Sequence, residues 1–158
     1  MPEVLAQTDA NIQAVAERAY QMIAKVFGVP YETAHRQTLC VTASDFMLRA
    51  LLRDGDPTVD QVERDVVGLD AGHHDYLVST AEGGERIIDS TWQQFLPAEA
   101  PAQHLPRVLI GSRERVMAQA QVAGIHDPQV LDVWRPLNET VAVRHESWRL
   151  SGKEFFPS

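Results

Sequence analysis

The sequence contains a single cysteine, Cys40, among its 158 residues, so no disulfide can form within the chain. Because disulfides belong to oxidising compartments, one lone thiol favours a reducing compartment. No apolar run approaches the roughly 20 residues that span a bilayer. The opening segment, MPEVLAQTDA, lacks the basic and apolar regions of a cleavable signal peptide. We therefore expect a cytoplasmic protein, or one exported to the cytosol of a target cell without such a peptide.

Positive charge is also scarce, with 14 Lys and Arg against 22 Asp and Glu and a formal net charge of −8. Proteins that bind nucleic acid carry clusters of Lys and Arg, and none occurs here. A basic patch for a membrane surface is absent as well. We therefore expect neither nucleic acid nor membrane as a partner, while the acidity favours solubility and basic partner surfaces. The oligomeric state stays open.

What the chain does contain is typical of one globular domain. The hydrophobic fraction is 44% and the charged fraction 23%, both ordinary values, and the length is enough to bury a core. No internal repeat, low-complexity block or domain linker interrupts the sequence. A single domain over residues 1–158 is predicted.

Helices are predicted in the N-terminal part. Asp9 is predicted to cap a helix that ends near Phe27, after which the chain loops to residue 38. Thr38 is predicted to cap a second helix that ends near Arg53 and buries an apolar face. A third helix is predicted over 59–66, because Thr58 and Gln61 have the spacing of a capping box.

Strands dominate the next part of the sequence. HDYLVS and ERIID are short runs joined by the glycine-containing segment TAEGG, which predicts a hairpin. Helices first, then an antiparallel sheet with a late helix, indicate an α+β fold with N-terminal helices packed on a small antiparallel sheet. The later elements predicted are a strand over 107–111, a helix from its cap Ser112 to Gly124, a short helix within 126–134 and a strand within 140–145.

Cys40 falls close to the start of the second predicted helix. Unpaired backbone N–H groups and the helix dipole favour an anion there, and such a position lowers the pKa of a thiol. The same N–H groups are suited to hold the oxyanion of an acyl-transfer reaction. The alternative is an ordinary buried thiol, the usual state of a free cysteine.

His74 and Asp89 lie on the two strands of the predicted hairpin. With a four-residue loop over 80–83, the two residues stand directly opposite on one face, about 5 Å apart at Cβ. Asp89 then orients the imidazole and leaves its other nitrogen for the thiol. A change of one residue in the loop selects His73 instead. We prefer His74, because it shares a face with Tyr76 whereas His73 shares one with Asp75.

A metal site is a further alternative, because potential ligands occur at Asp70, His73, His74 and Asp75. Their spacing matches no metal motif. We therefore expect no metal and no other cofactor.

These residues carry a resemblance to a known group of proteins. The segment HDYLVSTAEGGERIIDSTWQQF resembles the histidine strand, hairpin and aspartate strand of the papain-like and transglutaminase-like superfamily, and LCVTASDFMLRALLRDG resembles its cysteine helix. Ser90 stands where the superfamily usually has proline. The sequence is most similar to bacterial toxin or effector domains that deamidate glutamine through a Cys-His-Asp triad, with 34 residues from Cys40 to His74 and 15 from His74 to Asp89.

The resemblance covers residues 36–97 and implies a papain-like domain. Residues 1–35 would then form an N-terminal helix and 98–158 an accessory strand and helix. It also implies an oxyanion partner a few residues before the cysteine, for which Gln37 is the candidate. Trp92 is either a wall of the cleft or part of the core.

The activity that this resemblance implies is acyl transfer from a carboxamide through a Cys40 thioester, with His74 as acid and base and Asp89 as its orienting partner. A protein or peptide is the expected substrate, and glutamine deamidation is the favoured reaction. A transglutaminase or a cysteine peptidase would use the same triad. The change at Ser90 and the unmatched C-terminal third leave open a non-catalytic protein-binding module of the same fold.

Overall fold

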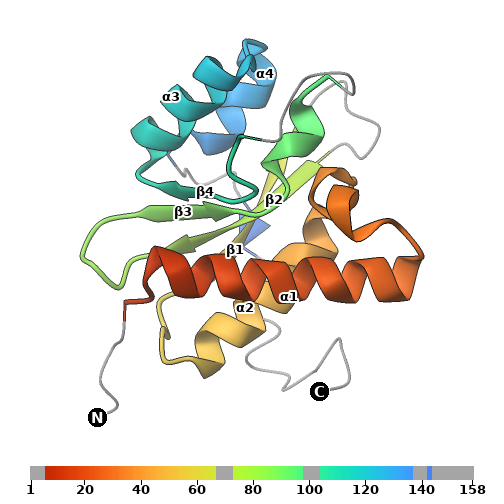
Figure 1. The fold of residues 1–158 in the computed structure, drawn as a ribbon. Helices are drawn as coiled ribbons and strands as arrows, with labels where there is room; N and C mark the ends of the chain where they lie inside the picture. The colour runs from red at the N-terminus through yellow and green to blue at the C-terminus, as the bar shows by residue number, and fades with distance from the viewer. Residues whose placement is uncertain (1–5, 67–72, 98–103, 137–141, 144–158) are drawn as a thin grey trace.

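The centre of the molecule is an antiparallel sheet that lies between two layers of helices (Figure 1). The computed structural model describes residues 6–66, 73–97 and 104–136, and the backbone of 142–143. The sheet has five strands in the order β4-β3-β2-β1-β5. The strands are β1 (Asp60–Asp65), β2 (His73–Ser79), β3 (Arg86–Asp89), β4 (Leu109–Gly111) and β5 (Ala142–Val143).

The helices divide between the two faces of the sheet, with α1 and α2 on one and α3 and α4 on the other (Figure 1). The predicted α+β architecture is therefore confirmed. The helices are α1 (Asp9–Phe27), α2 (Cys40–Arg53), α3 (Arg113–Ala123) and α4 (Pro128–Leu131), with short 3-10 helices η1 (Tyr31–Arg36), η2 (Trp92–Phe95) and η3 (Asp132–Trp134). None of the described helices is both long and apolar enough to cross a membrane.

Alternation along the central strands builds a separate core on each face. Leu77 and Ile88 pack in the cluster that contains the buried sides of α1 and α2. Tyr76, Val78 and Ile87 pack in the cluster beneath α3 and η3. Successive side chains of a strand point to opposite faces, so each face of β2 has its own chemistry.

The N-terminal helices begin at different caps from those predicted. Thr8 caps α1, its hydroxyl accepting from the backbone N–H of Asn11 at 3.1 Å, while Asp9 is the first helical residue. Thr38 does not cap α2, which begins at Cys40 after Leu39 and has no side-chain cap. Leu39 packs against the core instead. The predicted ends at Phe27 and Arg53 are confirmed, and η1 forms inside the predicted loop.

The helix predicted over 59–66 is wrong, because residues 60–65 form β1. Thr58 does not cap a helix, since its backbone N–H and hydroxyl both donate to Asp56, at 2.9 and 2.6 Å. β1 pairs with β2 along its whole length, from Asp60 opposite Val78 to Asp65 opposite His73. Pairing with a neighbouring strand thus outweighs the helical spacing of Val59, Val62 and Val66, on which the predicted helix also depended.

The hairpin of β2 and β3 has a longer loop than predicted. Ser79 pairs with Arg86 and Leu77 with Ile88, so the loop runs over residues 80–85. His74 and Asp89 are therefore not directly opposite but diagonal neighbours. Because the loop is longer by two residues, an even number, the two side chains still share one face.

Prediction was accurate for most of the C-terminal elements. Ser112 caps α3, accepting from the backbone N–H of Arg115 at 3.2 Å, and Gly124 ends the helix with φ 113°. The short helix predicted within 126–134 appears as α4 and η3, and β5 lies within the strand predicted over 140–145. The C-terminal segment 144–158 lies outside the described residues.

Candidate active site

The thiol of Cys40 lies at the first residue of α2 and is only 2% exposed. The first backbone N–H that bonds to a carbonyl one turn back is that of Ala43, which donates to Leu39 at 3.0 Å. The N–H groups of the preceding residues, 39–42, have no carbonyl of the helix to bond. Unpaired N–H groups and the positive end of a helix dipole therefore lie at the turn that contains Cys40, an arrangement suited to hold an oxyanion.

His74 and Asp89 form the strongest polar contact of the site. His74 Nε2 lies 2.6 Å from Asp89 Oδ2, and both side chains are fully buried. The diagonal register of β2 and β3 is what brings them together, since diagonal neighbours on one face lie within reach of long side chains. The bond occupies Nε2 and leaves Nδ1 as the nitrogen available for proton transfer.

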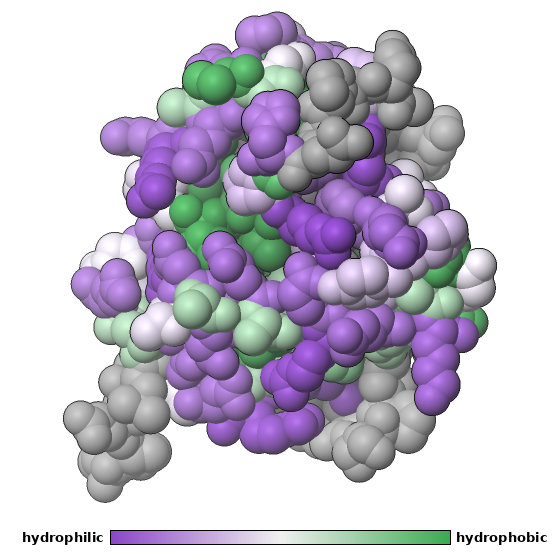
Figure 2. Space-filling model, in the orientation of Figure 1, coloured by the Kyte–Doolittle hydropathy of each residue, from purple (hydrophilic) through white to green (hydrophobic). Residues whose placement is uncertain are grey.

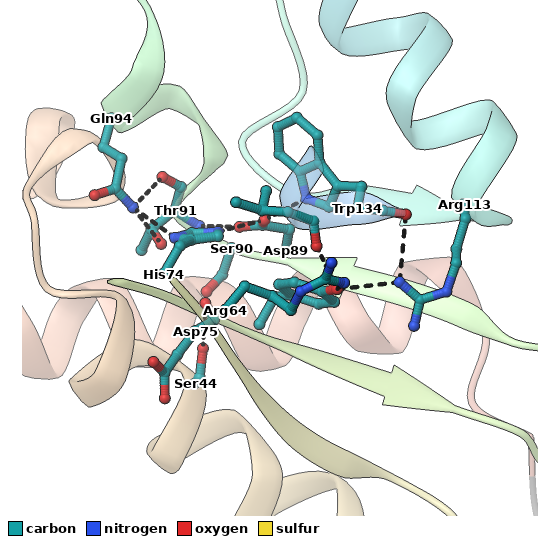
Figure 3. Close-up of polar contacts among 12 residues, drawn as sticks. Ser44, Arg64, His74, Asp75, Asp89, Ser90, Thr91, Gln94, Arg113 and Trp134 are labelled. Carbon is teal, nitrogen blue, oxygen red and sulfur yellow. Dashed lines mark hydrogen bonds and ion pairs between the residues drawn. The ribbon is translucent and has the colours of Figure 1, made fainter. Parts of the chain in front are cut away.

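Asp89 is itself held by two further donors. The Trp134 indole N–H donates to Oδ2 at 2.8 Å, and the backbone N–H of Thr91 donates to Oδ1 at 3.2 Å (Figure 3). Three donors therefore satisfy a carboxylate that has no contact with solvent. A carboxylate held in this way fixes the orientation of the imidazole that it contacts.

The environment raises the pKa of His74. Burial lowers it, but the charge and hydrogen bond of Asp89 outweigh burial, and the nearby Cys40 thiol adds to the rise, so that the pKa reaches about 10. The ring is also fixed by packing, with Phe95 edge-on at 4.8 Å between centroids. His74 is therefore suited to hold a proton in spite of its burial.

Part of the C-terminal third completes the site. Arg113 Nη1 donates to the Trp134 carbonyl at 3.3 Å (Figure 3). Arg64 Nη2 donates to the Asp132 carbonyl at 3.0 Å. The Tyr76 hydroxyl donates to a neighbouring carbonyl, that of residue 133, at 2.5 Å. These bonds hold η3 against β1 and β2, and so place the Trp134 indole on Asp89.

Gln94 is a site residue that sequence analysis missed. Its Nε2 lies 3.1 Å from His74 Nδ1 and 3.0 Å from the Thr91 carbonyl oxygen. It comes from η2, which begins three residues after Asp89. Trp134 was missed as well, because nothing in the sequence connects residues 89 and 134. A signal for Gln94 was its place in the Gln-Gln-Phe segment that contributed to the resemblance.

His73 lies on the opposite face of β2 from His74. A ring nitrogen of His73, a carboxylate oxygen of Asp75 and Cys40 Sγ lie within 4.8 Å of one another. These are ligand types found in zinc sites, but Gln61 donates to Asp75 at 2.9 Å, and His73 Nε2 lies 3.7 Å from a Glu63 oxygen. We assign no metal here. Asp70, the fourth potential ligand, lies outside the described residues.

The two remaining predicted site residues, Gln37 and Trp92, make hydrogen bonds outside the contacts of His74 and Asp89. The Gln37 amide nitrogen lies 3.5 Å from the Thr33 carbonyl oxygen, at the end of η1. Trp92 is 1% exposed, and its indole N–H donates to the Pro106 carbonyl at 3.0 Å. Trp92 is thus a core residue, and it also lines an apolar cavity of about 310 Å³ beside α3.

The face shown in Figure 2 is largely hydrophilic, with one hydrophobic hollow between α3 and α1. Comparison with protein-family models, curated proteins and solved structures gave no match.

Proposed function

We propose that this protein is a cysteine-dependent amide hydrolase, and specifically a protein glutamine deamidase of the papain-like and transglutaminase-like type. The observation that carries the proposal is the buried contact of 2.6 Å between His74 Nε2 and Asp89 Oδ2, beside the thiol at the start of α2. A buried imidazole with a raised pKa next to a cysteine is the arrangement that activates a thiol nucleophile.

The proposed reaction begins when His74 takes the proton of Cys40 at Nδ1. Cys40 Sγ then bonds to the carbonyl carbon of the carboxamide, and the N–H groups at the start of α2 hold the oxyanion. His74 returns the proton to the nitrogen as the C–N bond breaks and ammonia leaves. Water, deprotonated by His74, hydrolyses the thioester to a carboxylate and restores the thiol.

Two other reactions use the same thioester. With an amine as acceptor in place of water the protein would be a transglutaminase, and with a backbone amide as substrate it would be a cysteine peptidase. Intact-mass analysis of candidate protein substrates separates the three. Deamidation adds about one dalton, since NH₂ is replaced by OH, whereas crosslinking joins chains and cleavage shortens them.

The activation of the thiol is tested directly by alkylation. We expect iodoacetamide to label Cys40 of the wild type faster than Cys40 of His74→Ala at neutral pH. His73→Ala is the discriminating comparison, because a ring nitrogen of His73 also lies within 4.8 Å of Cys40 Sγ. That histidine is on the opposite face of β2 from Asp89, and we expect the smaller loss there. Equal labelling rates for the wild type and His74→Ala would contradict the proposal.

A further inference from the structure

The amide of Gln94 has a fixed orientation in the site. The Thr91 carbonyl, 3.0 Å away, can only accept a hydrogen bond, so the nearer atom of the amide is the nitrogen rather than the oxygen. The same nitrogen lies 3.2 Å from the Thr91 hydroxyl and 3.1 Å from His74 Nδ1. Gln94 therefore presents an N–H group to Nδ1, which can accept it only in the neutral ring that carries its proton on Nε2, toward Asp89 (Figure 3). Protonation of His74 at Nδ1, which its raised pKa favours, sets two donors against each other and turns Gln94 away from the ring.

This contact occupies the atom that the proposed reaction needs. Nε2 is committed to Asp89, so only Nδ1 can take the proton of Cys40. Gln94 covers that lone pair with an N–H group, while Cys40 is 2% exposed and His74 has no exposure. Proton transfer between the thiol and Nδ1 requires Gln94 to move away.

We propose that Gln94 occupies the subsite for the NH₂ group of a primary carboxamide, and that a substrate side chain displaces it. This inference rests on the proposed function. Three acceptors, His74 Nδ1 and two oxygens of Thr91, surround this one nitrogen. A primary carboxamide brings two N–H donors to them, whereas the nitrogen of a peptide bond has one N–H and a bulky substituent.

The position also suits the leaving group. A substrate nitrogen placed where Gln94 Nε2 lies would stand about one hydrogen bond from Nδ1, the atom that must protonate departing ammonia. The subsite therefore favours deamidation of glutamine or asparagine side chains over cleavage of peptide bonds. Gln94 itself acts as a positioning residue that closes the site in the absence of substrate.

The test compares two alkylating reagents on Gln94→Ala, which empties the subsite. Iodoacetamide has an NH₂ group, and 2-iodo-N,N-dimethylacetamide does not. For each protein, the rate constant of iodoacetamide at Cys40 is divided by that of 2-iodo-N,N-dimethylacetamide, and this ratio is divided by the same ratio for N-acetylcysteine. We expect the result to be about tenfold higher in Gln94→Ala than in the wild type, the effect of roughly one or two hydrogen bonds. A ratio equal to that of the free thiol would overturn the inference.

Gln121→Ala is the matched control, because it removes a glutamine amide from the exposed surface of α3 that has no part in the proposed reaction. We expect its ratio to equal that of the wild type. Gln94→Leu keeps the side-chain volume and should not show the rise, because the subsite remains filled. Thermal unfolding establishes that each variant is folded, and propionamide should protect Cys40 of Gln94→Ala from alkylation while N,N-dimethylpropionamide should not.

The same assay separates this inference from the function on which it rests. If His74→Ala leaves alkylation of Cys40 unchanged, both by itself and in combination with Gln94→Ala, the proposed triad is wrong. If His74 accelerates alkylation but the reagent ratio of Gln94→Ala stays that of N-acetylcysteine, the triad stands and the carboxamide subsite is wrong.

Discussion

Two buried histidines, His74 and His35, occupy environments that differ mainly in the charge of one partner. His74 Nε2 lies 2.6 Å from a carboxylate oxygen of Asp89. His35 Nε2 lies 3.2 Å from the amide oxygen of Gln93, which must accept because the amide nitrogen of Gln93 donates to Pro106. The first site contains an ionisable partner and the second a neutral one.

The two pKa values move in opposite directions as a result. For His35, burial lowers the pKa, the charge of Arg107 lowers it further, and the hydrogen bond of Gln93 is too weak to compensate, so the pKa is about 4. For His74, Asp89 outweighs burial and the pKa is raised to about 10. Burial alone therefore does not make a buried histidine neutral, since the partner decides which form is stable.

The largest effect is expected from Asp89→Asn, which gives His74 a neutral partner of the same size. Both carboxylate oxygens of Asp89 accept from donors, whereas an Asn side chain has one oxygen and one NH₂ group. In either orientation its NH₂ group faces a donor, which is the Thr91 N–H in one orientation and the donors of His74 and Trp134 in the other. We expect the pKa of His74 to fall and deamidase activity to drop about a thousandfold. Alkylation kinetics of Cys40 against pH measure the first effect and intact-mass rates the second. An unchanged pH profile would contradict it.

The next effect concerns stability in acid. The pKa of His35 is lowered from 6.5 to about 4 in the folded protein. Between these two pH values the unfolded chain therefore binds a proton at His35 that the folded chain does not bind. The stability that depends on neutral His35 is therefore complete above pH 6.5 and is lost as the pH falls toward 4, by about 2 kcal/mol. Urea unfolding at pH 7.5 and pH 4.5 measures this loss.

His35→Gln should weaken this acid dependence, since the substituted side chain does not titrate. The protonation of His74 changes stability with pH in the opposite direction. Because its pKa is raised, it contributes stability that is complete below pH 6.5 and is lost as the pH rises through about 10. Equal acid sensitivity in His35→Gln and the wild type would refute the assignment to His35.

A smaller effect is expected from Gln93→Glu, which gives His35 a carboxylate partner. The pKa of His35 should rise, so that the variant loses less stability in acid than the wild type. Above pH 8 it should be less stable by about 1 kcal/mol, because its carboxylate is buried without a protonated partner and the bond to Pro106 is lost. Crossing stability curves against pH are the expected result, and parallel curves would contradict it.

The smallest effect is expected from Trp134→Phe, which removes one donor to Asp89. Loss of a hydrogen bond to a charged group corresponds to about a tenfold fall in the rate of thiol alkylation. Trp92→Phe is the control, because it removes an equivalent indole N–H in the core that donates to Pro106 instead. If both variants lost reactivity equally, the effect would lie in packing and not in the contact with Asp89.

Local sequence signals were sufficient where a short segment makes its own structure. Gly28 ends α1 in a left-handed conformation, with φ 70°, and Ser112 with Gly124 bounds α3. The prediction over 59–66 was wrong because its helical spacing gave no account of the neighbouring strand. Thr38 was the wrong cap because the packing of Leu39 sets the start of α2.

The chemistry of the site was partly visible in the sequence. An even number of residues in the hairpin loop places His74 and Asp89 on the same face of the sheet. The observed loop is two residues longer than predicted, so the number is still even and the two residues still share a face. The sequence by itself thus determined the fold class, most helix ends and the side of the sheet on which this pair lies. These are properties of local conformation and of a two-residue period, and neither depends on distant contacts.

Only the tertiary structure decided what surrounds the pair. Trp134 reaches Asp89 across 45 positions of the chain because Arg64 and Arg113 hold η3 against the sheet. The turn of η2 brings the amide of Gln94 onto His74 Nδ1. Such contacts depend on how separate elements pack, and packing depends on the whole set of buried side chains rather than on any one segment.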